Sequence, residues 1–206
     1  MLPITLDLKR IRVLLAGEGA AARRRLGLLD EADPGEIEIY APDPEPGLAH
    51  AAGSRLRLRW PEAKDIARAQ LVFLAAVPEP IAARVNRIAD TSGVLLNIED
   101  DRARSDFHSA SVLRRGDLTL AISTSGKSPG LAAALRRLLE TQFGPEWKGR
   151  LDRVAALRAD WQQAGIASAT VARWTTAWLT AAMQDPVEKG AAWIAYRKKW
   201  NLPRSF

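Results

Sequence analysis

The sequence has no cysteine and only two histidines, His50 and His108. The absence of cysteine excludes disulfide bonds, thiolate zinc sites, iron–sulfur clusters and a cysteine nucleophile. Two histidines are too few for a multi-histidine centre, so we predict no metal bound by the protein itself. No apolar run approaches the roughly 18 residues of a membrane span, and the first residues lack a secretory pattern. We therefore expect a cytoplasmic protein without a membrane partner.

Charge is unevenly distributed along the 206 residues. Residues 1–105 carry 15 basic and 16 acidic side chains, a net charge of −1, whereas residues 106–206 carry 15 basic and 8 acidic side chains, a net charge of +7. A basic half favours an anionic partner such as a nucleic acid, an anionic lipid surface or a polycarboxylate ligand. The alternative is a solvated surface that is basic without a partner. No basic–aromatic recognition module is present, so we predict no nucleic-acid binding.

Residues 1–143 alternate between strand-like and helix-like patterns, which predicts an α/β fold with a parallel sheet and right-handed crossovers. Short apolar or alternating runs predict strands at Arg12–Ala16, Ile37–Tyr40, Leu56–Trp60, Leu71–Ala76, Val94–Ile98 and Leu118–Ile122. Helices are expected at Ala20–Leu29, Ile81–Asp90 and Gly130–Gln142, the last opened by a Ser128 N-cap and Pro129.

Residues from Gly144 onward have a different composition. Gly144-Pro145 marks a boundary, and six of the seven tryptophans lie at or beyond Trp147. Helical spacing predicts three helices, separated at Gly165 and at Asp185-Pro186. A segment so rich in tryptophan suits a small core or a dimer surface, and the alternative is a wall of a substrate site.

The first predicted strand leads directly into a glycine motif. Residues 17–22 read G-E-G-A-A-A, which matches G-x-G-x-x-A between a strand and a helix. The first glycine would permit the tight turn, the second would let a pyrophosphate approach the backbone, and the helix N-terminus would supply amide donors. The alternative is a glycine turn without a ligand. Asp43, just past the second strand, is a partial match to the acidic residue that binds the ribose. The candidate cofactor-binding residues are Gly17, Glu18, Gly19, Ala20, Ala21 and Asp43, with Ala76 and Val77 at the end of the next central strand.

Two further segments follow predicted strands. Asn97-Ile98-Glu99-Asp100-Asp101 stands at the carboxyl end of a strand, the edge at which open α/β sheets bind ligands, and a carboxylate there can take a proton. Ser123-Thr124-Ser125-Gly126-Lys127 places hydroxyls, a glycine and a lysine before a capped helix, a combination that can bind an anion. The alternative readings are a turn or helix cap for the first segment and a capping loop for the second.

Together these pieces resemble the precorrin-2 dehydrogenase / sirohydrochlorin ferrochelatase family, which includes the N-terminal module of siroheme synthases. The matching stretches are VLLAGEGAAARRR at 13–25, LVFLAA at 71–76, NIEDD at 97–101 and RRGDLTLAISTSGKSPGLAAALRRLLE at 114–140. The resemblance implies a Rossmann-like NAD-binding domain at 1–112, a dimerisation region at 113–145 and a small C-terminal helical domain at 146–206. It also implies a homodimer.

The family binds NAD and oxidises precorrin-2 to sirohydrochlorin, and many members also insert ferrous iron as a substrate to give siroheme. The resemblance places the family's general base at Asp100 and a substrate-pocket hydroxyl at Thr124. The substrate-binding candidates are Ser123, Thr124, Ser125, Lys127 and His108. The basic half of the chain suits a polycarboxylate tetrapyrrole. We predict an NAD-dependent precorrin-2 dehydrogenase.

The sequence departs from the family beside the predicted cofactor edge. Members read A-T-D-D where this chain has Ala76-Val77-Pro78-Glu79, and a nearby asparagine is replaced by Ala83. These departures leave a second hypothesis open: a dimeric tetrapyrrole-binding protein or chelatase that does not use NAD for redox chemistry. Where the family has Phe-x-x-Pro-Ala, this chain has Phe107-His108-Ser109-Ala110-Ser111. His108 is a candidate proton- or metal-handling group near the pocket, and the alternative is an ordinary surface or capped histidine.

Overall fold

The computed structural model describes residues 2–184, which form two compact units. The first unit comprises residues up to Ala110 together with Ser123–Pro129. The second comprises Ser111–Ile122 and the described residues from Gly130 onward. The loop that contains the hydroxyl-rich motif therefore belongs to the first unit, although it lies between two elements of the second. The three-domain division expected from the sequence stays a prediction.

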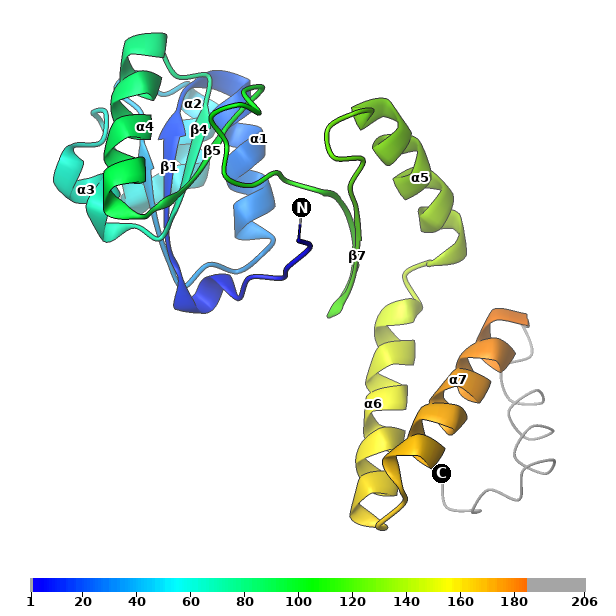
Figure 1. Ribbon diagram of the computed structural model, residues 1–206. Coiled ribbons are helices and arrows are strands. Elements are labelled where there is room, and N and C mark those ends of the chain that lie inside the picture. The colour runs from blue at the N-terminus through cyan, green and yellow to red at the C-terminus, as the bar shows by residue number, and fades with distance from the viewer. Residues whose placement is uncertain (1, 185–206) are drawn as a thin grey trace. The chain divides into compact units, whose positions relative to one another are not determined.

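A five-stranded parallel sheet, in the order β3-β2-β1-β4-β5, forms the centre of the first unit (Figure 1). Its strands are β1 (Arg12–Gly17), β2 (Glu36–Tyr40), β3 (Leu56–Arg57), β4 (Leu71–Ala75) and β5 (Leu95–Ile98). In the register, Leu14 lies opposite both Glu38 of β2 and Val72 of β4. This arrangement confirms the predicted Rossmann-like parallel sheet and puts the topological switch point between β1 and β4.

Helices cover both faces of this sheet. α1 (Gly19–Asp30) and α2 (Pro46–Ala52) lie on one face, and α3 (Ala63–Arg68) and α4 (Glu79–Ser92) lie on the other. Because side chains alternate along a strand, successive residues serve opposite cores. Leu15 packs with α1, and Leu14 packs with α3 and α4. Each fully buried leucine contributes about 1.5–3 kcal/mol, which favours this register over a one-residue slip.

The predicted strand at Leu56–Trp60 is shorter than expected. Only Leu56 and Arg57 pair with β2, as the edge strand β3. The backbone N–H of Arg59 donates to the carbonyl of Arg57 at 2.8 Å, which turns the chain out of the sheet. The alternating pattern of residues 56–60 therefore continues beyond the actual pairing. The short helices α2 and α3 and the 3-10 turns η1 (Leu8–Arg10) and η2 (Gly53–Arg55) have no counterpart in the sequence-based prediction.

The predicted strand at Leu118–Ile122 is not part of the parallel sheet. It is β7, which pairs antiparallel with β6 (Ser111–Arg115) as a separate two-stranded sheet. A two-residue turn of Gly116 and Asp117 joins them, and Gly116 has φ of +62°, which glycine adopts without strain. The Gly-Asp pair between two alternating runs is the hairpin signal that the strand–helix interpretation passed over.

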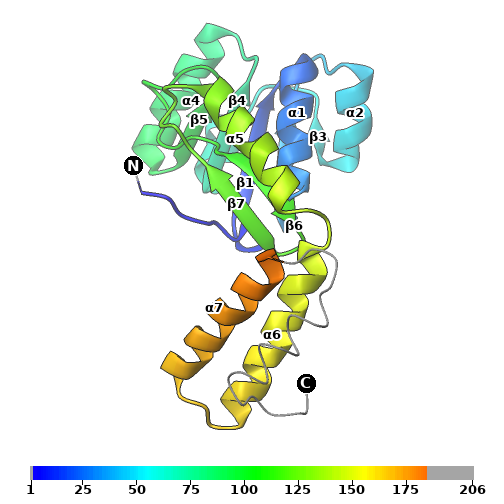
Figure 2. The ribbon, with the colours of Figure 1, turned by 90° about the vertical axis from the view of Figure 1, so that its right-hand side faces the viewer.

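The described part of the second unit also contains three helices: α5 (Pro129–Gln142), α6 (Trp147–Gln163) and α7 (Ser168–Gln184). α6 and α7 form an antiparallel pair (Figure 2), separated near Gly165 as predicted. Trp161 is buried between them and meets the ring of Trp174 edge-to-face at 5.2 Å. The third helix predicted beyond Asp185-Pro186 lies outside the described residues. In the part of the chain that the structure describes, no helix is long and apolar enough to cross a membrane.

Candidate functional site

Two glycines with different roles flank the turn between β1 and α1. A Cβ on Gly17 would lie 2.9 Å from the carbonyl carbon of Ala75, nearer still to its oxygen, and 3.2 Å from the Cβ of Ala22. Gly17 is therefore required by the close approach of β1, β4 and α1 rather than by a positive φ. Gly19 opens α1 with φ of +61°, and a Cβ there would meet nothing within 4 Å. The space beside Gly19 is open.

The beginning of α1 has free capacity for an anion. No side chain caps the helix, and its first turn contains no acidic residue. The N–H groups of Gly19, Ala20 and Ala21 have no partner in the preceding turn of a helix, and the positive end of the helix dipole lies there. This donor set, beside an open glycine, fits the pyrophosphate of a dinucleotide.

The carboxylate of Glu18 links this loop to the end of β2. Its Oε1 accepts a hydrogen bond from the backbone N–H of Asp43 at 3.2 Å. Two acidic side chains, Glu18 and Asp43, thus stand at the edge where a Rossmann fold binds the adenosine ribose. Carboxylates accept hydrogen bonds from ribose hydroxyls and repel a 2′-phosphate, so this edge fits NAD better than NADP.

A pocket of about 330 Å³ opens at the switch point, at the carboxyl ends of β4 and β5. Its lining comes from α1, from β4 with the loop after it, and from β5 with the loop after it: Ala21, Arg24, Leu74, Ala76, Val77, Ile98, Glu99 and Asp100. The pocket therefore brings together four of the predicted site residues, namely Ala21, Ala76, Val77 and Asp100. Arg24 adds a basic group, with Nη2 4.0 Å from Oε1 of Glu99.

Two residues that line this pocket have left-handed backbone conformations. Ala76 has φ of +54° and Asp100 has φ of +62°, and neither is glycine. Such conformations cost on the order of 1–3 kcal/mol each and persist only where the surrounding structure enforces them. Asp100 is exposed, so its carboxylate is open to solvent at the pocket rim.

The loop after β5 folds back on the strand through its own side chains. Ser105 Oγ accepts from the N–H of Ile98 at 2.9 Å and donates to the carbonyl of Asp101 at 2.5 Å. Asp106 Oδ2 accepts from the N–H of Leu96 at 2.8 Å. Asn97, which is buried, donates to the carbonyl of Phe107 at 2.9 Å. This loop presents Asp100 at its tip.

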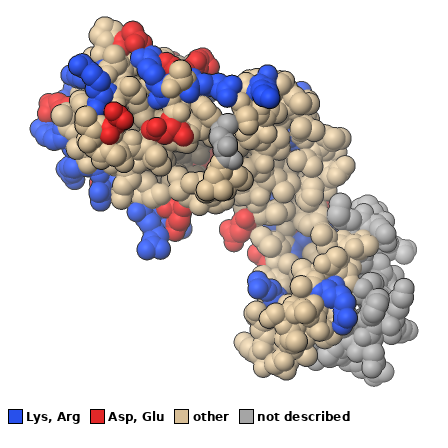
Figure 3. Space-filling model, in the orientation of Figure 1, with Lys and Arg blue, Asp and Glu red and all other residues tan. Residues whose placement is uncertain are grey.

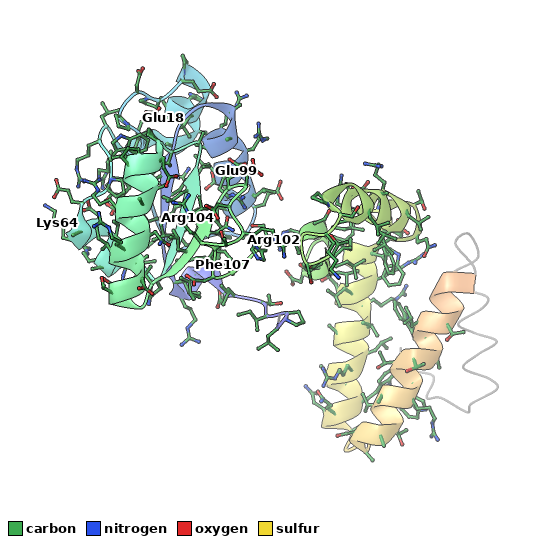
Figure 4. All side chains as sticks on the ribbon, turned by 45° about the horizontal axis from the view of Figure 1, so that its top comes forward. Glu18, Lys64, Glu99, Arg102, Arg104 and Phe107 are labelled. Carbon is green, nitrogen blue, oxygen red and sulfur yellow. The ribbon has the colours of Figure 1, made fainter. Side chains whose placement is uncertain are left out.

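Arg104 supplies the main charge contacts of that loop. Its Nε lies 2.5 Å from Oδ2 of Asp101, and its two terminal nitrogens lie 2.7 and 3.0 Å from the two carboxylate oxygens of Glu79. Hydrogen bonds from Arg104 lower the pKa of both carboxyls below their ordinary values, and the two carboxylates raise the pKa of Arg104. Figure 4 labels Glu99, Arg102 and Arg104, which all come from this loop.

A second half-buried arginine lies on α1. Arg25 stacks over the ring of Phe73 at 5.2 Å from its centroid and donates to Oγ of Ser109 at 2.6 Å. Burial lowers the pKa of its guanidinium, and the nearby carboxylate of Glu99 opposes that effect.

The hydroxyl-rich loop is a tight turn. Thr124 Oγ1 accepts from the N–H of Ser128 at 3.2 Å and donates to its carbonyl at 3.1 Å, and Ser123 Oγ accepts from the N–H of Ser125 at 3.2 Å. Ser125 and Gly126 both have positive φ. These hydroxyls thus shape the loop itself.

The loop also lies near the acidic loop. A Cβ on Gly126 would lie 2.7 Å from Cζ of Arg102, so the two loops of the first unit approach each other closely there. Lys127 is exposed. His108 is partly buried in the segment after Phe107 and is not among the residues that line the pocket. The substrate-binding roles of these residues stay predictions.

Comparison with known proteins gives two family matches. Residues 4–111 match a family described as putative NAD(P)-binding, and residues 115–142 match one described as sirohaem biosynthesis protein central. The chain belongs to this putative NAD(P)-binding family. The nicotinamide dinucleotide cofactor predicted from the sequence is thereby confirmed.

Curated relatives are siroheme synthases. Siroheme synthase 1 of Serratia proteamaculans is 32% identical over 180 residues, which are 79% of this chain and 37% of that protein. The siroheme synthase of Methylococcus capsulatus is 34% identical over 158 residues, which are 75% of this chain and 33% of that protein. The chain thus spans about a third of the length of these relatives. The predicted resemblance to the N-terminal module of siroheme synthases is confirmed.

A solved structure shares the fold. SirC, a precorrin-2 dehydrogenase, superposes with a TM-score of 0.70 at 22% sequence identity, covering 96% of this chain and 100% of that one. This match confirms the predicted fold class of a Rossmann-like domain followed by further helices.

The sequence-based prediction did not include Arg24, Glu79 and Arg104 among the site residues. Arg24 is one of three successive arginines, and nothing in the sequence marks which of them faces the pocket. Glu79 and Arg104 are 25 residues apart, so their pairing depends on the adjacency of β4 and β5. The spacing of Asp101 and Arg104, an acid followed by a base three residues later, was the one local signal of this cluster.

Proposed function

We propose that this chain is an NAD-dependent dehydrogenase that oxidises precorrin-2 to sirohydrochlorin. The observation that carries the proposal is the pocket at the switch point, because it joins the dinucleotide-binding edge at Ala76 and Val77 to an exposed carboxylate at Asp100. Dehydrogenation of a tetrapyrrole removes a hydride and a proton. An acceptor cofactor and a base are therefore needed in one cavity.

The dinucleotide would be held by the backbone at Gly19, Ala20 and Ala21 and by the acidic ribose edge at Glu18 and Asp43. When bound, it supplies the hydride acceptor. The family description leaves NAD and NADP open, and the two carboxylates at the end of β2 favour NAD.

Asp100 would take the substrate proton on its carboxylate. Its exposure and its position at the loop tip let a bulky substrate reach the carboxylate. Arg24 in the pocket, Arg102 and Lys127 in the adjoining loops are cations that suit the carboxylates of precorrin-2. Figure 3 shows basic and acidic side chains interspersed over the first unit, which gives carboxylate-binding positions within a mixed surface.

Two finer parts of the proposal concern iron and assembly. Insertion of ferrous iron as a substrate requires removal of pyrrole protons, and Asp100 can accept these as well. A homodimer is supported by α5, on which Leu131, Leu135 and Leu138 recur at helical spacing and are 53%, 38% and 55% exposed. Sedimentation of the purified protein checks the dimer.

The decisive experiment mixes purified protein with enzymatically made precorrin-2 and NAD⁺, anaerobically and without metal. NADH that appears in step with the sirohydrochlorin spectrum supports the dehydrogenase. If precorrin-2 persists and no NADH forms, the dehydrogenase proposal is wrong, and the tetrapyrrole-binding or chelatase alternative takes its place. Addition of ferrous iron to sirohydrochlorin then tests chelation directly.

Asp100→Asn tests the role of the base. Asparagine tolerates the left-handed backbone at this position, so the fold should persist. Loss of a general base typically costs about 10²–10⁴-fold in rate, and we expect turnover to fall by at least about 10²-fold with an unchanged melting temperature. Turnover at the wild-type rate would show that Asp100 is not the base.

A further inference from the structure

The pocket has two rims that come from different strands. One rim is the segment after β4, with Ala76 in its left-handed conformation and Pro78 at the N-cap of α4. The other rim is the loop after β5, with Asp100 at its tip. In the proposed reaction the first rim faces the cofactor and the second presents the base. Their separation therefore sets how the base that takes the proton lies relative to the cofactor that would take the hydride.

Arg104 is the side chain that connects these two rims. Its Nη1 and Nη2 bind both oxygens of Glu79, the first residue of α4, at 2.7 and 3.0 Å. Its Nε and its backbone N–H bind the two oxygens of Asp101, next to Asp100, at 2.5 and 3.1 Å. Four hydrogen bonds from one residue thus join the start of α4 to the loop that displays the base.

The geometry of this contact is better suited to fixing the position of the Asp100 loop than to raising the free energy of unfolding. Isolated surface ion pairs contribute little, but a bidentate arginine fork within a network fixes the relative orientation of its partners. The side chain of Glu79 is 69% exposed, whereas those of Arg104 and Asp101 are 31% and 25% exposed. Arg104 and Asp101 are thus held within the loop that bears Asp100, and the side chain of Arg104 extends from this loop to Glu79 on the cofactor rim.

We propose that Arg104, together with Glu79, is a positioning residue that holds the Asp100 loop at a fixed distance from the cofactor rim. This inference rests on the proposed function for its kinetic consequence and on the structure alone for the bridge itself. Lysine keeps the charge but lacks the planar fork, so it cannot hold both carboxylates in this arrangement.

The test compares Arg104→Met, Arg104→Lys and Glu79→Gln with a matched control, Arg55→Met. Arg55 also binds a carboxylate through both terminal nitrogens, at 2.6 and 3.2 Å from Asp30, and is 32% exposed, but it is not among the residues that line the pocket. Hydrogen exchange is measured first, because it requires no activity, in residues 81–84, where the N–H groups of Ile81 and Ala82 bond to the carbonyl of Pro78 at the start of α4, and in residues 98–106.

We expect Arg104→Met and Glu79→Gln to accelerate exchange in both segments and Arg55→Met to leave both unchanged. The kcat of Arg104→Met should fall by about 10- to 100-fold, because a displacement of about 1 Å can cost about 10²-fold. The KM for NAD⁺ and for precorrin-2 should change by less than about threefold, because neither ligand loses a direct contact. Arg104→Lys should recover part of kcat.

The inference would be overturned by unchanged exchange in Arg104→Met, by a loss of activity that appears only as a raised KM, or by equal effects in Arg55→Met. Acceleration confined to residues 98–106 would also overturn it, because the two rims would then be independent. If the wild-type protein forms no NADH, the proposed function fails, and the exchange data still decide whether Arg104 bridges the rims.

Discussion

Replacing each glycine of the β1–α1 loop by alanine separates packing from cofactor binding. In Gly17→Ala the new methyl group would lie within 2.9 Å of the Ala75 carbonyl carbon and against its oxygen, both backbone atoms of a central strand. The strands must separate to relieve this contact, which weakens the hydrogen bond from Glu18 N to Ala75 O. Overpacking of this kind costs about 1–3 kcal/mol and occasionally more.

We expect Gly17→Ala to lower the free energy of unfolding by about 3 kcal/mol, the upper part of that range, because backbone atoms cannot rotate away. At roughly 2–4 °C per kcal/mol for a chain of this length, the melting temperature should fall by about 6–12 °C. Gly19→Ala has open space around its new Cβ, so its only cost is that alanine disfavours a positive φ, which lowers the free energy of unfolding by about 1–2 kcal/mol. Its methyl group nevertheless points into the cradle proposed for the pyrophosphate, so NAD⁺ affinity should fall at least about tenfold.

The assays are urea denaturation and calorimetric titration with NAD⁺. Gly27→Ala is the matched control, because Gly27 lies within α1, has open space at its Cβ and should gain about 0.5–1 kcal/mol. A Gly17→Ala protein as stable as the wild type would refute the packing argument. Unchanged NAD⁺ affinity in Gly19→Ala would refute the assignment of the cradle.

Three other outcomes follow from the structure. A double variant, Glu18→Gln with Asp43→Asn, should lower the ratio of kcat/KM for NAD⁺ to kcat/KM for NADP⁺ by about tenfold, because the two charges that repel a 2′-phosphate are removed. Arg104 lowers the pKa of Glu79 below its ordinary 4.5, so their contact stabilises the fold above that pH and is lost as the pH falls through the lowered value. Urea titrations should therefore show a steeper loss of stability below pH 4.5 in the wild type than in Arg104→Met. Trp161→Ala should cost about 3–5 kcal/mol in the helical pair while NAD⁺ binding to the first unit persists, as circular dichroism and titration would report.

The parallel sheet and its core could be predicted because their signals are local. Each central strand is a short apolar run followed by a helical pattern, and the alternation of side chains assigns Leu14 and Leu15 to opposite faces. The glycine motif was also readable, since it requires only a strand before it and a helix after it. The positive φ of this turn, however, is at Gly19 rather than Gly17. Gly17 is needed for close packing on Ala75, which depends on which strand lies beside β1.

Features that depend on distant neighbours could not be predicted. The apolar run of β7 is typical of a strand in either kind of sheet, and only its pairing with β6 makes it antiparallel. The edge strand β3 ends after two residues because Arg59 bonds back to Arg57, which the alternation of residues 56–60 does not reveal. The grouping of residues 123–129 with the first unit likewise rests on contacts such as that between Gly126 and Arg102.

The departure from the family at residues 76–79 has a physical explanation in these contacts. Ala76 takes the left-handed conformation, Val77 packs against the core between the sheet and α4, and Pro78 fixes φ at −57° before the helix begins. Backbone torsions and apolar packing thus hold this rim without the side-chain hydrogen bonds that threonine and aspartate could make. Glu79 is the one acidic residue of the segment 76–79, and both of its carboxylate oxygens accept hydrogen bonds from Arg104. The rim therefore keeps a defined shape beside Asp100, and the residues at 76–79 are compatible with the cofactor edge that we propose there.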